Sequence, residues 1–197
     1  MILWINGAFG AGKTSTAYEL RRRLPDAYVY DPENAGYFIR GNIPPSIRRP
    51  DFQDYPEWRR FNRDMLTLLA REYTGTIIVP MTVTRPDYYA EMTEGLMQLD
   101  SPPRHFILYA SKQTLQRRLT KRLERKDAWA RAQIDRCIHA FDHELDGEKL
   151  ETDELNIDQV VATLASRSGL TLLPDRRSRV RRSVDRLIVT LQHIRGK

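Results

Sequence analysis

The sequence predicts a three-layer α/β/α fold with a mostly parallel sheet of about five strands. Three observations support this prediction: short apolar runs recur along the chain, segments with helical spacing separate them, and a glycine-rich loop follows the first run. Continuous rather than alternating apolar runs are typical of strands covered on both faces. Strands that alternate with helices in this way form a doubly wound sheet, which binds ligands at the carboxyl ends of its strands.

The strands are predicted from short apolar runs that end at turn residues. The first run lies directly before the glycine-rich segment, and the later runs are far enough apart for helices to connect them. The predicted strands cover residues 3–5, 27–30, 76–80, 105–109 and, as a short fifth strand, about 149–152.

The helices are predicted from apolar residues at helical spacing and from capping residues at their ends. Pro25 ends the first helix, and the hydroxyl of Ser111 can cap a later one. Helices are expected at residues 15–24, in a segment that ends near 73–75, at 111–123, at 128–141, and from a cap at Asn156 or Asp158 to Gly169.

The composition is typical of a soluble protein. The chain has 197 residues, of which 41% are hydrophobic and 29% charged, and no apolar stretch approaches the about 20 residues that span a bilayer. No basic leader precedes the first apolar run, and Cys137 is the single cysteine. We therefore expect one globular unit in a reducing, cytoplasmic environment.

The net charge of +6 arises from the end of the chain. Residues 1–173 contain 24 basic and 24 acidic residues, whereas residues 174–197 contain 8 basic and 2 acidic ones. A nucleic-acid-binding domain usually carries basic residues interleaved with aromatic ones on its globular body. This distribution disfavours nucleic acid as a partner.

The basic tail, residues 174–197, is expected to form an amphipathic helix and not an independent domain, so that residues 1–173 make up the body. Arg179, Arg182 and Arg186 surround its apolar face. Two interpretations stay open: the helix packs against the body, or it also touches an anionic membrane surface, which would place the protein at the inner face of the membrane. The apolar face comprises Val180, Val184, Leu187, Ile188, Leu191 and Ile194.

The segment from Gly7 to Thr14 fits the phosphate-binding pattern G-x-x-x-x-G-K-[ST] and lies between a predicted strand and a predicted helix. Its glycines let backbone N–H groups turn toward a phosphate, and the positive end of the helix adds to the attraction. Lys13 is expected to reach the β- and γ-phosphates of ATP, and Thr14 to bind Mg²⁺. The expected nucleotide-binding residues are Gly7, Ala8, Phe9, Gly10, Ala11, Gly12, Lys13, Thr14 and Ser15.

Other motifs narrow the prediction to a P-loop kinase-like fold. The D-x-x-G and N-K-x-D segments of switch-type GTPases are absent. No aspartate follows the third or fourth predicted strand, where a Walker-B metal ligand would stand. Asp31, at the end of the second strand, is the best-placed carboxylate to accept a proton from a substrate hydroxyl. The alternative for Asp31 is a turn residue before Pro32.

A lid is expected near residues 118–130, in the helix and loop that follow the fourth strand. Arg118 and Arg122 recur at a spacing of four residues, opposite a leucine stripe. Such arginines stabilise the charge on a phosphoryl group during transfer, so both are candidate catalytic residues. The alternative is a solvent-exposed basic face.

The segment between the second and third strands is the candidate acceptor site. It combines aromatic rings with arginines, which suits a ring-bearing or sugar-like ligand. Helical spacing of Trp58, Phe61 and Met65 equally allows a place in the core. The candidate residues are Tyr37, Phe38, Arg40, Arg48, Arg49, Phe52, Tyr55, Trp58, Arg59 and Phe61.

The chain resembles the tunicamycin-resistance proteins of the TmrB type, which are bacterial P-loop ATP-binding proteins. The resemblance extends over nearly the whole length and is most specific in two segments, residues 51–53 and 79–82. It implies antibiotic resistance, either by modifying the drug or by binding it. Its motifs are WINGAFG at residues 4–10, GKT at 12–14, YVYDPE at 28–33, DFQ at 51–53, VPMT at 79–82, ASK at 110–112 and QIDRC at 133–137.

Together, the residues and the resemblance predict an ATP-dependent phosphotransferase that acts on a nucleoside-like small molecule such as a tunicamycin-type antibiotic. Two alternatives stay open. One is ATP-dependent binding of the antibiotic at the membrane without chemistry, and the other is a housekeeping nucleoside or nucleotide kinase.

Overall fold

The computed structural model describes residues 1–120 and 127–195, except for the side chains of residues 127, 179 and 191–195. Its sheet has five strands in the order β2-β3-β1-β4-β5, and every neighbouring pair is parallel. The sequence prediction of a mostly parallel, five-stranded sheet is therefore confirmed. The strands are β1 (Ile2–Gly7), β2 (Ala27–Val29), β3 (Thr76–Pro80), β4 (Arg104–Tyr109) and β5 (Glu148–Glu151).

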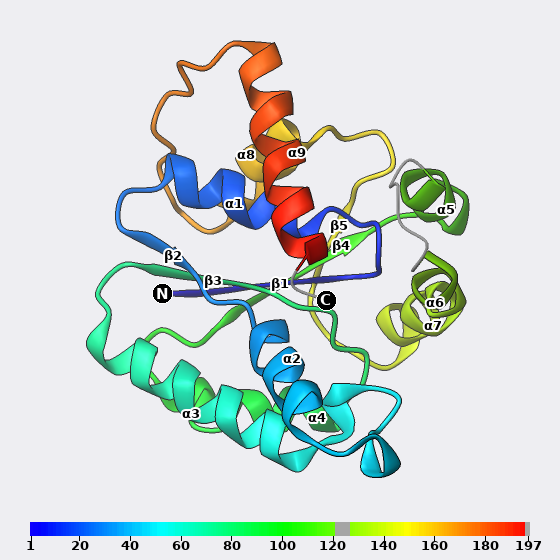
Figure 1. The fold of residues 1–197 in the computed structure, drawn as a ribbon. Helices are drawn as coiled ribbons and strands as arrows, with labels where there is room; N and C mark the ends of the chain where they lie inside the picture. Colours follow the sequence, from blue (N-terminus) through cyan, green and yellow to red (C-terminus); the bar gives the residue numbers. More distant parts are fainter. Residues whose placement is uncertain (121–126, 196–197) are drawn as a thin grey trace.

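Helices cover both faces of the sheet (Figure 1). On one face lie α1 (Lys13–Arg23), α8 (Ile157–Arg167) and α9 (Arg179–Arg195). On the other face lie α2 (Glu33–Asn42), α3 (Pro56–Glu72) and α4 (Pro86–Thr93). Beside them are α5 (Lys112–Thr120), α6 (Asp127–Ala132) and α7 (Ile134–His143), with the short 3₁₀ helices η1 (Pro45–Ile47), η2 (Phe52–Asp54) and η3 (Leu96–Gln98).

The core consists of two apolar clusters that share β1. Every residue of β1 is buried, because the strand lies in the middle of the sheet with helices above and below it. One cluster joins β1 to α1, α7 and α8 and includes Leu20 and Cys137. The other joins β1 to α3 and α4 around Trp4 and Trp58.

One predicted helix differs from the observed ones, and the end of another cannot be compared. The helix expected at residues 128–141 is broken at Gln133, whose N–H is 3.2 Å from the carbonyl oxygens of both Trp129 and Ala130. A shared N–H of this kind tightens the last turn of α6, which ends at Ala132, and α7 begins at Ile134. The helix expected from Ser111 is observed to Thr120, and its predicted end at residues 121–123 lies outside the described residues.

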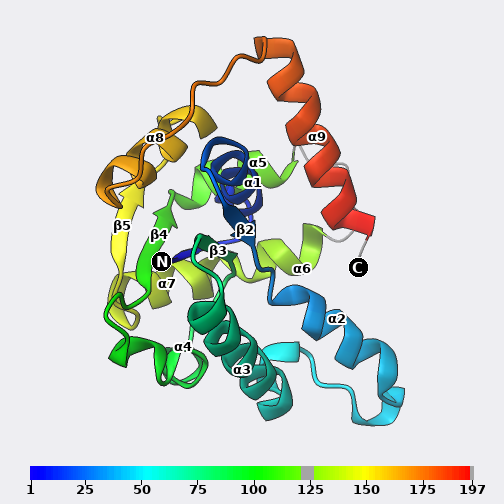
Figure 2. The same cartoon turned by 90° about the vertical axis from the view of Figure 1, so that its left-hand side faces the viewer.

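The C-terminal helix α9 contacts the body through its polar face. Asp185 and Val189 are its buried residues among those with described side chains. Val180, Val184, Leu187 and Ile188 are between 44% and 74% exposed, so these four residues of the predicted apolar face do not pack on the body. Figure 2 shows α9 running along the outside of the molecule.

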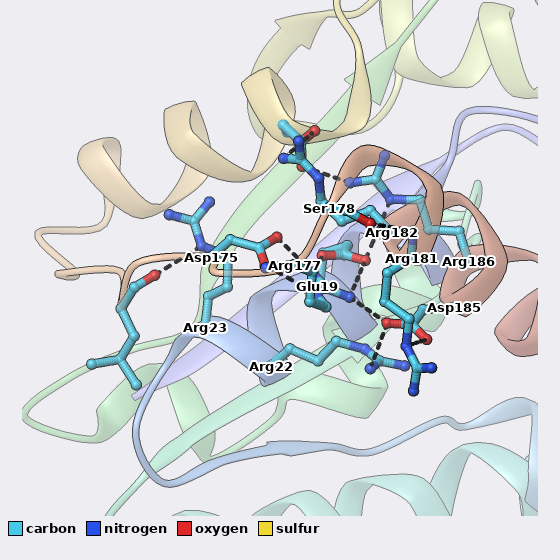
Figure 3. A network of polar contacts seen from close by, with 12 residues as sticks. Glu19, Arg22, Arg23, Asp175, Arg177, Ser178, Arg181, Arg182, Asp185 and Arg186 are labelled. Carbon is cyan, nitrogen blue, oxygen red and sulfur yellow. Dashed lines mark hydrogen bonds and ion pairs between the residues drawn. The ribbon is translucent and has the colours of Figure 1, made fainter.

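Ion pairs connect α9 to helices α1 and α8 (Figure 3). Glu19 of α1 is at the centre: its carboxylate accepts from Arg177 at 2.5 Å and from Arg186 at 3.3 Å. Arg186 also pairs with Asp158 of α8 at 2.5 Å, and Arg22 pairs with Asp185 at 3.3 Å. The side chain of Glu19 is only 3% exposed, so its charge is compensated by these arginines rather than by water.

The Glu19→Gln variant is expected to loosen α9, because the amide keeps the shape of the side chain but removes the charge that both arginines face. Hydrogen bonds to charged groups contribute about 2 kcal/mol, so the tail should be released several times faster by limited trypsin digestion. Mass spectrometry measures the released fragment. Glu57→Gln, which removes an exposed ion pair with Arg60, is the matched control. Equal tail release in both variants would contradict the role of Glu19.

The described part of the chain contains no helix with the length and apolar character required to cross a bilayer.

Candidate nucleotide-binding site

The loop after β1 has the backbone conformation of a phosphate cradle. Gly7, Gly10 and Gly12 have φ values of 146°, 88° and 97°, which residues with a side chain rarely adopt. A Cβ atom at Gly7 would lie 2.7 Å from the carbonyl oxygen of Leu108 in β4. The loop therefore requires glycine at Gly7 both for its conformation and for its close approach to the neighbouring strand.

Helix α1 begins directly after this loop with an uncapped N-terminus. Its N-cap is Gly12, which has no side chain to accept from the first N–H groups, and its first turn contains no acidic residue. Lys13, Thr14 and Ser15 occupy this turn and are partly buried. The first N–H groups of a helix form a favourable site for an anion. The residues from Gly7 to Ser15 thus fit a nucleotide phosphate.

Lys13 lies across the loop. Its Nζ donates to the carbonyl oxygens of Gly7 at 3.0 Å and Ala8 at 3.1 Å, and it is 5.4 Å from the centre of the Phe9 ring. The Phe9 ring in turn meets Trp129 of α6 edge to face at 5.0 Å. The ammonium group is therefore held over the cradle by the loop itself.

Asn6, the last residue before the loop, connects three segments through its buried side chain. Its Oδ1 accepts from the N–H groups of Gly7 at 2.8 Å and Val83 at 3.0 Å, and its Nδ2 donates to the carbonyl oxygen of Val83 at 2.8 Å. Nδ2 also lies 3.2 Å from Nε2 of His105 in β4. Burial lowers the pKa of His105 to about 4, so its ring is neutral and Nε2 can accept this hydrogen bond.

Thr82, just after β3, connects the cradle to the segment that contains η2. Its hydroxyl donates to the carbonyl oxygen of Gly7 at 2.8 Å, and its own carbonyl oxygen accepts from the amide of Gln53 at 3.1 Å. Arg59 then holds Gln53 by donating to its carbonyl oxygen at 2.6 Å. Asn6, Thr82 and Gln53 were not among the predicted site residues, although each lies in a motif that carries the family resemblance.

Asp31 follows β2 at the same edge of the sheet as the cradle. Since β3 separates β2 from β1, Asp31 lies beyond the loop by roughly two strand spacings, about 10 Å. Its Oδ1 accepts from the N–H of Glu33 at 3.0 Å, which is a turn contact at the start of α2. Its negative charge also contributes to the raised pKa of Tyr18, after burial of that ring. The structure therefore shows a turn contact of Asp31, and its role as a proton acceptor stays a prediction.

The two arginines predicted in the lid have different outcomes. Arg118 donates to the hydroxyl of Thr152 at 3.1 Å and to its carbonyl oxygen at 2.5 Å, so it is bound at the end of β5. Closing over phosphate would require Arg118 to exchange both hydrogen bonds. Arg122, together with residues 121–126 of the predicted lid, lies outside the described residues.

The candidate acceptor residues divide between the core and the surface. Tyr55 and Trp58 are buried in the core, whereas Phe38 and Phe61 are 71% and 51% exposed. Phe52 lies between these groups and packs on α2, where a Cβ atom at Gly36 would come within 2.5 Å of its ring. Arg59 pairs with Glu91 of α4 at 2.6 Å. The position of Arg59 is thus explained by its polar contacts, and the positions of Tyr55 and Trp58 are explained by packing in the core.

Comparisons with known proteins agree with this geometry. A family model described as an AAA domain matches residues 2–143. The structure of a tunicamycin resistance protein from Deinococcus radiodurans superimposes with a TM-score of 0.68 at 28% sequence identity, and the match covers 88% of this chain and 99% of that one. The resemblance inferred from the sequence is confirmed.

More distant structures share the fold alone. A sugar kinase from a Janibacter species is 15% identical with a TM-score of 0.63, over 86% of this chain and 95% of that one. The APS kinase of Mycobacterium tuberculosis, in complex with AMPPNP and APS, is 20% identical with a TM-score of 0.60, over 85% and 96%. Among curated proteins, no sequence matches the chain significantly.

Replacing Lys13 by alanine is expected to weaken binding of magnesium-ATP by about 2–3 kcal/mol, because charge-assisted contacts to phosphate would be lost. Isothermal titration calorimetry measures this loss, and Lys112→Ala provides a control that removes an exposed lysine after β4. Unchanged ATP affinity in Lys13→Ala would mean that the loop does not hold the phosphates.

Proposed function

The chain belongs to the AAA domain family, and we propose that it is an ATP-dependent phosphotransferase acting on a hydroxyl group of a nucleoside-like small molecule. The uncapped start of α1 behind the glycine cradle is the observation that carries the proposal. The similarity to a tunicamycin resistance protein supports a tunicamycin-type antibiotic as the acceptor. The kinase-like fold of more distant neighbours supports phosphoryl transfer as the reaction.

The residues of the cradle have distinct proposed roles. The N–H groups between Gly7 and Ser15 bind phosphate oxygens, and Lys13 exchanges its carbonyl partners for the β- and γ-phosphates. The Thr14 hydroxyl is in the first turn of α1, where it can hold Mg²⁺. Magnesium, when bound, neutralises the charge that develops on the phosphates during transfer.

Asp31 is the proposed general base. In the transfer step, an acceptor hydroxyl oxygen forms a bond to the γ-phosphorus, the bond from that phosphorus to ADP breaks, and the hydroxyl proton passes to Asp31. Asp31 and the cradle lie at the same edge of the sheet, roughly two strand spacings apart, so an acceptor bound between them would reach both. Arg118 and Arg122 remain candidates for stabilising the transferred group, Arg118 after release from Thr152.

The proposed reaction predicts that tunicamycin incubated with protein and magnesium-ATP gains the mass of one phosphate. Asp31→Asn should abolish this gain while ATP binding and folding persist, because the amide oxygen can still accept from Glu33. Mass spectrometry of the drug and calorimetry of ATP binding measure the two effects. Asp100→Asn, at an exposed surface site, is the control. Full turnover by Asp31→Asn would show that Asp31 is a turn residue and not the general base.

Two other outcomes of this assay distinguish the alternatives. Tight binding of tunicamycin without a mass gain favours ATP-dependent sequestration, which the threonine at the end of β3 in place of an acidic metal ligand also favours. Turnover of common nucleosides or nucleotides, but not of the drug, favours a housekeeping kinase.

We also propose that α9 brings the cytoplasmic protein to an anionic membrane surface. The proposal is supported by the outward position of Val180, Val184, Leu187 and Ile188, which would enter the headgroup region while the polar face holds the body. Arg181, whose side chain is 71% exposed, can meet lipid phosphates. This arrangement differs from the sequence expectation, because arginines of the polar face are already paired with carboxylates of the body.

The membrane proposal predicts co-sedimentation with anionic vesicles at low ionic strength and weaker binding as salt screens the headgroups. Replacing Leu187 and Ile188 together by serine should remove most of the binding, since burial of the apolar stripe contributes to it. The control is Leu68→Ser, which changes an exposed leucine on α3. Wild-type protein that stays in the supernatant at low salt would contradict the proposal.

A further inference from the structure

A long ion pair connects α7 to the start of η2. Nη2 of Arg136 lies 3.7 Å from Oδ2 of Asp51, which is within ion-pair range but longer than a charge-assisted hydrogen bond. The Asp51 side chain is 16% exposed and that of Arg136 is 49% exposed. The guanidinium of Arg136 therefore has a charged partner but does not form a short hydrogen bond with it.

Both partners are fixed to segments that contact the phosphate cradle. Asp51 begins η2 and accepts from the N–H of Gln53 at 3.0 Å, while Gln53 is connected through Thr82 to the carbonyl oxygen of Gly7. Arg136 precedes Cys137, which is fully buried in the same cluster as Ala8 and Ala11 of the loop. Asp51 and Arg136 thus lie on two segments that are each connected to the phosphate loop, one by hydrogen bonds and the other by packing.

The electrostatic surroundings agree with this placement. Burial raises the pKa of the Cys137 thiol to about 11, and the positive charges of Lys13 and Arg136 oppose this rise. Lys13 and Arg136 therefore act on one thiol from nearby positions. Burial also raises the pKa of Asp51, which is opposed by the Gln53 N–H and by Arg136. Asp51 is therefore a partly desolvated carboxylate, and its nearest charged partner, Arg136, is 3.7 Å away, while Arg40 adds a weaker positive influence.

We propose that Arg136 is a catalytic arginine that binds the γ-phosphoryl group of ATP, and that Asp51 holds it in position before the nucleotide arrives. A phosphoryl group carries more negative charge than a carboxylate and can accept two parallel N–H bonds, so it competes with Asp51 for the guanidinium. Arg118 is bound to Thr152, whereas Arg136 lies beside the cradle with half its side chain accessible. The proposal rests on the proposed function, because it requires ATP in the loop.

The test compares two nucleotides that differ at the γ-position. Calorimetry with magnesium-AMPPNP and with magnesium-ADP gives an affinity ratio that needs no acceptor substrate. Arg136→Ala should weaken AMPPNP binding roughly tenfold or more and change ADP binding less than about twofold, as expected for the loss of contacts to one charged group. Asp51→Asn should strengthen AMPPNP binding relative to ADP, because it removes the competing carboxylate.

Asp135→Asn is the matched control on the same helix, since it removes an exposed pair with Lys112 without touching Arg136. Circular dichroism and melting confirm that each variant is folded. If the wild type binds both nucleotides and folded Arg136→Ala has the same AMPPNP to ADP affinity ratio, the role of Arg136 is overturned while the proposed function is not. A wild type that binds neither nucleotide overturns the proposed function and, with it, this role.

Discussion

The site depends on one buried amide, that of Asn6. Its oxygen accepts two backbone N–H groups and its nitrogen donates to a backbone carbonyl, so the end of β1 is fixed to the segment after β3. A buried amide left without partners would cost several kcal/mol, which makes alternative arrangements of these segments unfavourable. The glycine loop starts at the next residue, so its position is set by this junction.

The two sides of the site are constructed differently. The phosphate side consists of backbone N–H groups at a helix start, and glycine conformations set its shape. The other side consists of side chains that hold one another: Thr82 binds Gln53, and Arg59 binds both Gln53 and Glu91. A cradle of backbone N–H groups suits phosphate, a group that many ligands have in common. A network of side chains can differ between related proteins and can therefore select a particular acceptor.

The sequence was sufficient to predict the features that depend on local patterns. Apolar runs predicted the five strands, and the loop motif predicted a helix start behind β1, because both patterns reflect neighbours in the chain. Features that depend on distant residues were not predictable. The outward apolar face of α9 depends on the ion pairs of Arg186 with Glu19 and Asp158, which lie 167 and 28 residues away from it in the sequence. Likewise, Arg118 of α5 donates a hydrogen bond to Thr152, which directly follows β5 and is distant in the sequence.

The central position of β1 also determines when the phosphate loop can form. Leu3 pairs with Ile78 of β3 on one side and with Arg104 of β4 on the other, so the first strand of the chain obtains its neighbours only after half of the protein has been synthesised. Contacts of such large sequence separation form late, because a long loop must first be closed. A nascent N-terminal fragment therefore contains the whole motif but no cradle. If nucleotide binds this loop as proposed, it stabilises by mass action only the chains that have completed their sheet.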